Sequence, residues 1–331
     1  MSSKKIATAK TALIFGISGQ DGAYLAQLLL NHGYLVHGTS RDKEITSFAN
    51  LHHLNLFASI TLHSAVLTDF RSVIEVIQHV QPDEIYNLAG QSSVALSFDQ
   101  PVDTINGGIV GTLNILEAIR FLKIETRFYN AASSECYGNT EAGPATEATP
   151  FQPRSPYGVG KAAAFWAVAN YRAAYGLYAC SGILFNHESP LRPARYVTQK
   201  IVRGALDIAD NKYQKLTLGT LSIARDWGWA PDYVDAMARM LQSSSPEDLI
   251  IATGETHTLE EFVKKVFSKV NLQWENHIEI NKTLQRPSDI YYSAANPGRA
   301  REVLDWSAET KFDSLVSRLI EAELERRRFA G

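Results

Sequence analysis

The sequence predicts an α/β fold in which a mostly parallel sheet is covered by helices on both faces. In the first half of the chain, short apolar segments of strand length alternate with segments of helix length. This alternation is typical of a parallel sheet, because each helix returns the chain to the edge where the next strand begins. The chain has 331 residues, 45% of them hydrophobic, which is enough for a large α/β unit and a smaller second one.

The predicted elements follow one another regularly up to residue 184. Strands are predicted at 11–15, 35–39, 60–63, 85–88, 127–131 and 178–184. Helices are predicted over 21–32, 70–80, 104–122 and 156–175. Beyond residue 184 the alternation ends, with Pro190 and Pro193 followed by a helix near 197–210. This change indicates that a different unit begins there.

The bulk composition excludes some classes of partner. A formal net charge of −3 gives no basic excess for binding nucleic acid, and no apolar segment is long enough for a membrane span or a signal peptide. The two cysteines, Cys136 and Cys180, favour reduced thiols and a cytoplasmic location over a disulfide framework. The adjacent pair His52 and His53 lacks the spacing of a helical zinc site, so no metal is expected.

The first strand leads directly into a glycine-rich loop. Gly16, Gly19 and Gly22 form a G-x-x-G-x-x-G pattern between that strand and the first helix. Glycines allow the backbone to turn tightly and to approach a pyrophosphate, and the helix N-terminus offers free N–H groups to the phosphates. The alternative is an ordinary strand-to-helix turn, but the position at the first strand favours a dinucleotide site.

With this loop, the predicted fold becomes a Rossmann-type doubly wound parallel sheet with a smaller C-terminal α/β substrate domain. Residues 1–185, together with about 222–254, are assigned to the dinucleotide-binding domain. Residues 186–221 and 255–331 are assigned to the substrate domain.

The end of the second strand bears on which dinucleotide binds. An acid there would hold the ribose 2′-hydroxyl of NAD, whereas an arginine would hold the 2′-phosphate of NADP. Arg41 follows the strand first and favours NADP, because a guanidinium pairs with a phosphate bidentately. Asp42 comes next and leaves NAD possible.

Tyr157 and Lys161 are candidates for proton transfer. They lie four residues apart after Pro156, at the start of a predicted helix, so they share one helix face. A lysine cation beside the tyrosine, and the positive nicotinamide of an oxidised cofactor, would lower the pKa of the phenol. The phenolate could then take a proton from a sugar hydroxyl while hydride leaves. The alternative is a pair of surface helical residues.

Ser133 and Glu135 follow the strand at 127–131. They are therefore expected at the carboxyl edge of the sheet, where ligands bind in open α/β sheets. Ser133 could bond the same hydroxyl as Tyr157, and Glu135 could act as a second acid or base. An exposed loop carboxylate is the alternative for Glu135.

Several motifs together resemble those of the extended short-chain dehydrogenases/reductases: F-G-I-S-G-Q-D-G at 15–22, N-L-A-G at 87–90, S-S-E at 133–135 and Y-G-V-G-K at 157–161. Longer segments closely resemble the GDP-mannose 4,6-dehydratases in particular: P-F-Q-P-R-S-P-Y-G-V-G-K at 150–161, G-I-L-F-N-H-E-S-P-L-R at 182–192, V-T-Q-K-I at 197–201, R-D-W-G at 225–228 and A-T-G-E-T-H-T at 252–258. The similarity covers nearly the whole chain.

The resemblance implies a redox-neutral dehydration of a GDP-linked hexose with bound NADP. Tyr157 would deprotonate the 4-hydroxyl as hydride passes from C4 to the cofactor, with Ser133 orienting that hydroxyl. Glu135 would remove the C5 proton, the C6 hydroxyl would leave as water, and hydride would return to C6. The product would be the 4-keto-6-deoxy sugar nucleotide.

The resemblance also assigns binding residues. Cofactor contacts are implied at the glycine loop and the end of the fourth strand, as well as at the catalytic pair: Gly16, Gly19, Gln20, Asp21, Gly22, Arg41, Leu88, Ala89, Tyr157 and Lys161. Contacts to the nucleotide diphosphate or the sugar pocket are implied at Asn186, Glu188, Arg192, Val197, Lys200, Arg225 and Arg286. Cationic side chains suit a diphosphate, although each could instead be a surface charge.

Some positions depart from the family pattern. Asp42 replaces the second arginine of the usual pair, Val66 replaces an acid expected near the adenine, and Asn50 stands near an arginine that the family uses across its subunit contact. NAD and either a homodimer or a homotetramer therefore stay open. Two further alternatives are a reductase or epimerase on a related nucleotide sugar, and a nonenzymatic cofactor-binding regulator.

Overall fold

A seven-stranded parallel sheet forms the centre of the molecule. The computed structural model describes residues 9–284 and 286–330. The strand order is β10-β6-β5-β4-β1-β2-β3, and every neighbouring pair is parallel. The strands are β1 (Thr11–Phe15), β2 (Leu35–Ser40), β3 (Thr61–Ser64), β4 (Glu84–Asn87), β5 (Arg127–Ser133), β6 (Ala179–Leu184) and β10 (Leu249–Ile251).

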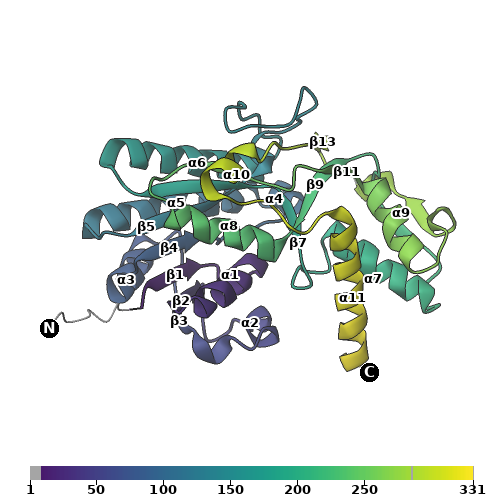
Figure 1. The fold of residues 1–331 in the computed structure, drawn as a ribbon, viewed down its shortest axis with the longest axis horizontal. Coiled ribbons are helices and arrows are strands. Elements are labelled where there is room, and N and C mark those ends of the chain that lie inside the picture. Colours follow the sequence, from purple (N-terminus) through teal and green to yellow (C-terminus); the bar gives the residue numbers. More distant parts are fainter. Residues whose placement is uncertain (1–8, 285, 331) are drawn as a thin grey trace.

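Helices cover both faces of this sheet (Figure 1). Alternate residues of β1 show why: Ala12 and Ile14 join one apolar core, while Leu13 and Phe15 join another on the opposite face. The helices are α1 (Gln20–Asn31), α2 (Ala49–His53), α3 (Phe70–Val80), α4 (Val94–Asp99), α5 (Pro101–Leu122), α6 (Pro156–Tyr175), α8 (Ala230–Gln242) and α10 (Gly298–Leu304). Two buried faces make the sheet doubly wound, which confirms the predicted fold class.

A second group of elements lies beside the carboxyl edge of the large sheet, on the right in Figure 1. Strand β9 pairs with β7, β11 and β13, and β12 pairs with β8. A separate apolar core joins strands β8 and β9 to three helices. The elements are β7 (Asn186–Glu188), β8 (Leu216–Leu218), β9 (Ala224–Trp229), β11 (Thr256–Thr258), β12 (Ile278–Ile280), β13 (Tyr292–Ser293), α7 (Val197–Ala209), α9 (Leu259–Lys269) and α11 (Phe312–Ala330).

The predicted strands and helices agree closely with those observed. The helix predicted over 70–80 is α3, and the one predicted over 104–122 begins three residues earlier, at Pro101. Strand β10 returns to the large sheet beside β6, whereas β9 joins the second group. The division of the chain into a dinucleotide domain and a substrate domain stays a prediction.

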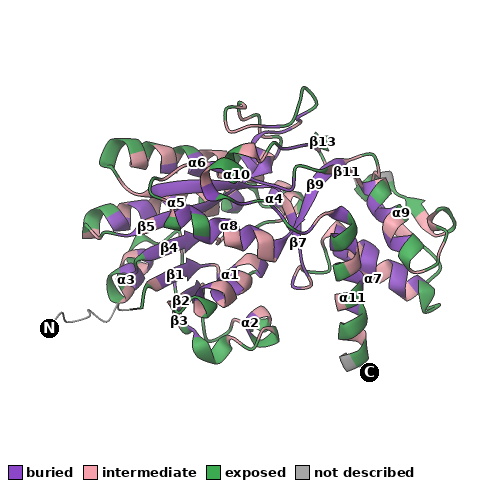
Figure 2. Ribbon diagram, viewed as in Figure 1, coloured by how far each residue is buried: buried purple, intermediate pink, exposed green. Residues whose placement is uncertain are grey.

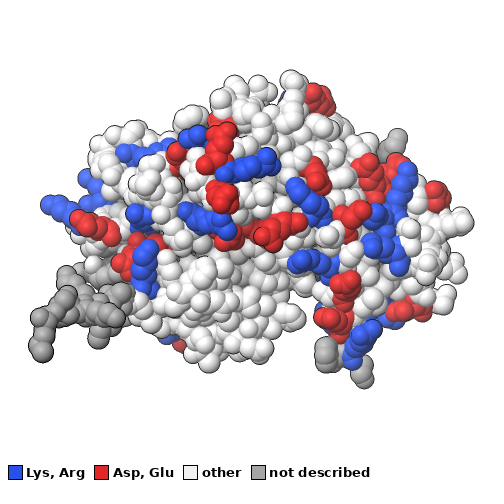
Figure 3. Space-filling model, in the orientation of Figure 1, with Lys and Arg blue, Asp and Glu red and all other residues white. Residues whose placement is uncertain are grey.

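The surface shows the polar character expected of this fold. The inner strands of the large sheet are buried, whereas the edge strand β3 and the outer faces of the helices are exposed in part (Figure 2). On the face shown in Figure 3, acidic and basic side chains are interspersed. Within the described residues, no helix has the length and apolar character needed to cross a membrane. Cys136 and Cys180 are free and buried.

Candidate active site

The glycine loop is shaped by close backbone contacts at the carboxyl edge of the sheet. Gly16 has φ of +87°, and a Cβ there would lie 2.8 Å from the Cα of Ala89, in the loop after β4. A Cβ on Gly22 would lie 2.5 Å from the carbonyl oxygen of Gly16. The amide of Leu88 donates to Phe15 at 3.0 Å. A larger residue at either position would therefore clash with the backbone, so the glycines make the tight turn possible. Phosphate binding by this loop stays a prediction.

The N-terminus of α1 points its free amides into this loop. Gly19 precedes the helix, and among the described residues no side-chain hydrogen bond caps the N-terminus of α1. The side chains of Gln20 and Asp21 turn instead toward β7, where Gln20 donates to the carbonyl oxygen of His187 at 3.3 Å. The backbone amides of this first turn therefore stay available for an anion, which the helix dipole also favours.

The turn after β2 presents Arg41 to solvent. The carboxylate of Asp42 accepts a hydrogen bond from the amide of Glu44 at 2.9 Å, and the carbonyl oxygen of Asp42 accepts from the Thr46 hydroxyl at 2.6 Å. The carboxylate of Asp42 thus already accepts a hydrogen bond within its own turn. The buried hydroxyl of Ser40 has no hydrogen-bond partner among the described residues.

Tyr157 and Lys161 lie at the start of α6, directly above the end of β5. Ser155 caps this helix by accepting from the amide of Gly158 at 3.1 Å. A Cβ on Gly158 would lie 2.7 Å from the carbonyl oxygen of Glu135, so this glycine lets α6 approach the loop after β5. The ammonium nitrogen of Lys161 lies 5.8 Å from the centre of the Tyr157 ring, which confirms that the two share one helix face.

The protein chain by itself raises the pKa of Tyr157. Burial raises the pKa of its phenol well above the ordinary value, and a hydrogen bond with Ser133 offsets part of this increase. Lys161 donates at 2.7 Å to the carbonyl oxygen of Ala131, and burial lowers the pKa of its ammonium. The prediction that Lys161, together with the positive nicotinamide of an oxidised cofactor, lowers the pKa of Tyr157 therefore stays a prediction, because burial dominates in the protein chain alone.

Glu135 is held between α6 and the second group of elements. Its carboxylate accepts from the hydroxyl of Ser155 at 3.5 Å. Burial raises the pKa of this carboxyl above its ordinary value, while the positive charges of Arg225 and Arg286 act to lower it. Glu135 is thus a largely buried carboxyl that faces two arginines, and not the exposed loop carboxylate of the alternative interpretation.

Arg225 and Arg286 converge on one carboxylate. A nitrogen of each guanidinium lies 3.4 Å from the same oxygen of Asp289. Arg225 lies on β9 and is buried, and the desolvation of its side chain lowers its pKa. Two adjacent guanidinium groups with one shared carboxylate leave a net positive charge beside Glu135.

The remaining predicted substrate residues lie on β7 and at the start of α7. Asn186 pairs with Trp227 of β9, so it lies next to the strand that carries Arg225. Glu188 lies 3.2 Å from Arg192 and accepts from the hydroxyl of Thr198 at 2.7 Å. Val197 is the first residue of α7, and Lys200, one turn later, donates to the carbonyl oxygen of Thr217 at 2.6 Å.

Three residues of this region were absent from the sequence prediction. Asp289 pairs with both arginines, Ser155 connects the cap of α6 to Glu135, and His187 contacts Asp21 at 2.9 Å. The S-P dipeptide before Tyr157 is a recognisable helix start and could have indicated Ser155. Asp289 has a near partner in Arg286, three residues earlier, but its pairing with Arg225 spans 64 positions. His187 has no local signal, because its partner Asp21 lies 166 positions away.

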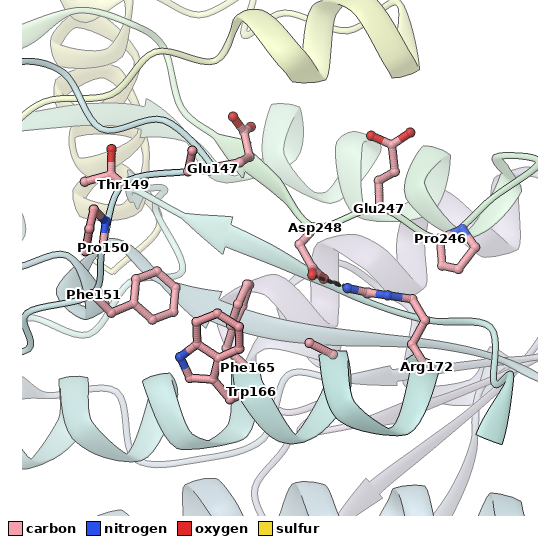
Figure 4. A pocket seen from close by; sticks show the side chains of 12 residues that line it. Glu147, Thr149, Pro150, Phe151, Phe165, Trp166, Arg172, Pro246, Glu247 and Asp248 are labelled. Atoms are coloured by element: carbon pink, nitrogen blue, oxygen red, sulfur yellow. Dashed lines mark hydrogen bonds and ion pairs between the residues drawn. The ribbon is translucent and has the colours of Figure 1, made fainter. Parts of the chain in front are cut away.

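A separate surface cavity of about 540 Å³ lies along the outer face of α6 (Figure 4). Phe151 and Trp166 form an aromatic side of it, and an ion pair of 2.5 Å joins Arg172 to Asp248. None of the predicted site residues is among the described residues that line this cavity. It is therefore distinct from the site at the carboxyl edge of the sheet.

A sequence model of the family described as GDP-mannose 4,6 dehydratase matches residues 13–319. The chain belongs to this family. The match spans both the glycine loop and the residues around Arg286, so the whole candidate site lies within the part of the chain that the family shares.

Known members of the GDP-mannose 4,6-dehydratase family are similar over almost their full length. GDP-mannose 4,6 dehydratase 1 of Arabidopsis thaliana is 43% identical, with 96% of this chain and 90% of that protein covered. GDP-mannose 4,6 dehydratase of Homo sapiens is 40% identical, with 95% and 91% covered. The crystal structure of dTDP-glucose 4,6-dehydratase from Bacillus anthracis in complex with NAD has a TM-score of 0.84 at 19% identity and covers 97% of this chain and 98% of that one. This structural likeness bears on the fold alone.

Proposed function

We propose that this protein is a GDP-mannose 4,6-dehydratase, which converts GDP-mannose to its 4-keto-6-deoxy form. The observation that carries the proposal is the position of Glu135. Its carboxyl is held beside the Ser133, Tyr157 and Lys161 group and faces Arg225 and Arg286. A site for oxidation of a hydroxyl needs the first group, and an elimination needs an additional base.

The cofactor in this proposal is NADP, held by the loop at 16–22, by Leu88 and Ala89, and by Arg41. The uncapped amides of α1 and the crowded glycines fit a pyrophosphate. The exposed Arg41, the occupied carboxylate of Asp42 and the unpartnered hydroxyl of Ser40 support a ribose that carries a 2′-phosphate. When bound, the nicotinamide supplies the hydride acceptor and donor of the reaction.

The residues of the chain then divide the proton transfers between them. Tyr157 takes the proton of the sugar 4-hydroxyl, and Ser133 hydrogen-bonds the same hydroxyl and fixes its position. Lys161 supplies a positive charge that stabilises the phenolate form of Tyr157. Glu135 removes the proton from C5 and gives it to the departing C6 hydroxyl, so that the C6–O bond breaks, a C5–C6 double bond forms and water leaves.

The diphosphate is bound by the second group of elements. Arg225, Arg286 and Lys200 supply the cations, and Asn186 and the start of α7 at Val197 complete the pocket. Glu188 and Arg192 form an ion pair that lines it.

The proposal includes a setting for the enzyme. It acts as a homodimer or homotetramer in the cytoplasm. Closed symmetric assemblies are the usual form of soluble enzymes, and the two free, buried cysteines suit a reducing compartment.

Mass spectrometry of the purified protein incubated with GDP-mannose, without added reductant, tests the proposal. Loss of one water from the nucleotide sugar, with no net consumption of NADPH, is the expected result. An unchanged nucleotide sugar would contradict it. Consumption of one NADPH for each keto-sugar supplied would instead identify a reductase on a related nucleotide sugar.

A further inference from the structure

Asp21 and His187 form a contact between two segments far apart in the sequence. Nε2 of His187 lies 2.9 Å from Oδ2 of Asp21. Asp21 lies in the first turn of α1, directly after the glycine loop, and His187 is the central residue of β7, between Asn186 and Glu188. The contact therefore joins the loop proposed to bind the dinucleotide to the strand proposed to bind the substrate.

Further hydrogen bonds fix the same junction. Gln20 donates to the carbonyl oxygen of His187 at 3.3 Å and to Oδ1 of Asp21 at 3.0 Å. The hydroxyl of Ser189 donates to the side-chain oxygen of Gln20 at 2.7 Å. The His187 ring also stacks on Tyr233, with a distance of 4.6 Å between ring centres. The orientation of the imidazole is thus determined from several sides.

The partners of the imidazole determine its charge. Nδ1 of His187 lies 2.8 Å from the carbonyl oxygen of Phe185, which can only accept, so Nδ1 carries a hydrogen. Asp21 lies at a helix N-terminus and accepts from Gln20, and both conditions favour its ionised form. An ionised carboxylate also accepts only, so Nε2 carries a hydrogen as well. The ring is therefore an imidazolium.

Burial opposes both charges, and the pairing overcomes it. Burial acts to lower the pKa of His187, but the charge of Asp21 and its hydrogen bond raise the pKa above its ordinary value. Burial acts to raise the pKa of Asp21, but His187 and Gln20 lower it. The other charged or titratable groups around the pair are Tyr24, Tyr129, Lys161, Glu188, Arg192 and Tyr233.

We propose that the His187 imidazolium and the Asp21 carboxylate are a positioning pair that holds the glycine loop against β7, so that affinity for the dinucleotide depends on the charge of His187. The proposal rests on the proposed function in one respect, that the loop binds a nicotinamide dinucleotide. The pair acts through the loop backbone, because the carboxylate of Asp21 already bonds to His187 and Gln20.

The sign of the pH dependence follows from the two pKa directions. A raised pKa of His187 means that its contribution to stability is complete below its unfolded value and is lost as pH rises through its folded value. A lowered pKa of Asp21 means that its contribution is lost as pH falls through its folded value. Dinucleotide affinity is therefore expected to fall on the alkaline side as His187 loses its proton.

Nitrogen-15 NMR of the wild-type imidazole groups tests the charge directly. The His187 signal is identified by its loss in the His187→Gln variant. Both ring nitrogens are expected to show the shifts of an imidazolium at pH 7, because one faces a carbonyl oxygen and the other a carboxylate, whereas an ordinary histidine is mostly neutral at that pH. A neutral tautomer at pH 7 would overturn the proposal, whether or not the protein dehydrates GDP-mannose.

Fluorescence titration with NADPH, with NADH in parallel, tests the positioning role. Asp21→Asn and His187→Gln are each expected to weaken binding about tenfold, as for a lost charged hydrogen bond, and the double variant is expected to be no weaker than either. Both variants should also lose the alkaline fall in affinity. Asp313→Asn is the matched control, because Asp313 lies in the first turn of α11 and pairs with Lys265 on the surface.

Additive losses of affinity, or an alkaline fall that persists in the variants, would reject the positioning role of the pair. Absence of dinucleotide binding in the wild type would instead contradict the proposed function and leave the NMR result to decide the pair.

Discussion

At the scale of single residues, burial sets the acid–base character of the site. It raises the pKa of Glu135 and of Tyr157 and lowers that of Lys161. A carboxyl with a raised pKa is a stronger base when ionised. A lysine with a lowered pKa loses its proton more readily. Burial thus makes Glu135 a stronger base and the ammonium of Lys161 a stronger acid.

Replacement of Glu135 by Gln separates oxidation at C4 from elimination. The amide keeps the size of the side chain but cannot take the C5 proton. Exchange of isotope between C4 and the cofactor is expected to continue, while release of water falls by about 100-fold or more. Mass spectrometry with C4-deuterated GDP-mannose measures both. Near wild-type dehydration would show that Glu135 is not the C5 base.

The pH dependence of dehydration should carry the titration of Glu135. Because its pKa is raised above the ordinary 4.5, the acid limb of the rate should lie above that pH.

The folded chain holds this proton more strongly than the unfolded chain, so the contribution of Glu135 to stability is largest at low pH and is lost as pH rises through the folded pKa. Denaturant titrations from pH 4 to 8 measure the free energy of unfolding of the wild type and of Glu135→Gln. An identical pH dependence of stability in the variant would contradict the raised pKa of Glu135.

Tyr157→Phe should lower the rate of dehydration by about 100- to 10,000-fold, since the proton acceptor for the 4-hydroxyl is removed. Tyr171→Phe is the control. Tyr171 lies on the same helix and donates to Glu117 at 2.6 Å, away from the site, so the rate should stay unchanged. Steady-state kinetics of both variants check this. Equal losses would indicate that removal of any phenol from α6 perturbs the helix.

At the scale of elements, the position of α6 depends on its close packing against α5. A Cβ on Gly108 of α5 would lie 3.3 Å from the backbone of Gly160 of α6, and a Cβ on Gly160 would lie 3.3 Å from the Cα of Ile105. The two helices can approach this closely because both residues lack side chains. Since Tyr157 and Lys161 are on the same helix as Gly160, this contact contributes to their placement.

Gly108→Val should therefore destabilise the protein by about 1–3 kcal/mol, because the new side chain separates the two helices. A loss of activity should accompany it. Gly107→Ala is the matched control, since a Cβ there meets no described atom within 4 Å other than its chain neighbours and its own helix backbone. That change should stabilise the helix by about 0.5–1 kcal/mol. Denaturant unfolding measures both, and equal stability of the two variants would contradict the packing argument.

At the scale of the whole molecule, the site is assembled from two groups of elements. The large sheet supplies the glycine loop and the catalytic residues, and the strands around β9 supply the arginines. The two sets meet at Glu135, which faces Arg225 and Arg286, and at the Asp21–His187 pair. Away from these two junctions, binding of the dinucleotide and binding of the sugar nucleotide should respond to different substitutions.

Arg286→Gln tests this separation. It removes one guanidinium from the proposed diphosphate site and leaves the glycine loop untouched. The KM for GDP-mannose should rise about 10- to 100-fold, as for one lost charged hydrogen bond, while the affinity for NADPH stays unchanged. Steady-state kinetics and a fluorescence titration measure the two quantities. A parallel loss of both affinities would show that the two binding sites are not separable in this way.

The features that the sequence predicts well depend on neighbours in the chain. The glycine loop and the helix that carries Tyr157 and Lys161 follow from spacings of three and four residues. The strand order and the second core do not follow, because β9 and β10 are close in sequence yet join different sheets. Their pairing is decided by burial against distant segments.

By itself the sequence determined a doubly wound α/β fold, a glycine loop at the first strand, and the helix face shared by Tyr157 and Lys161. Only the tertiary structure decided which charges meet. Asp289 joins Arg225 across 64 positions, and His187 joins Asp21 across 166. It also decided the directions of the pKa shifts. Backbone geometry fixes contacts between near neighbours, whereas burial and long-range charge pairs exist only once the chain has folded.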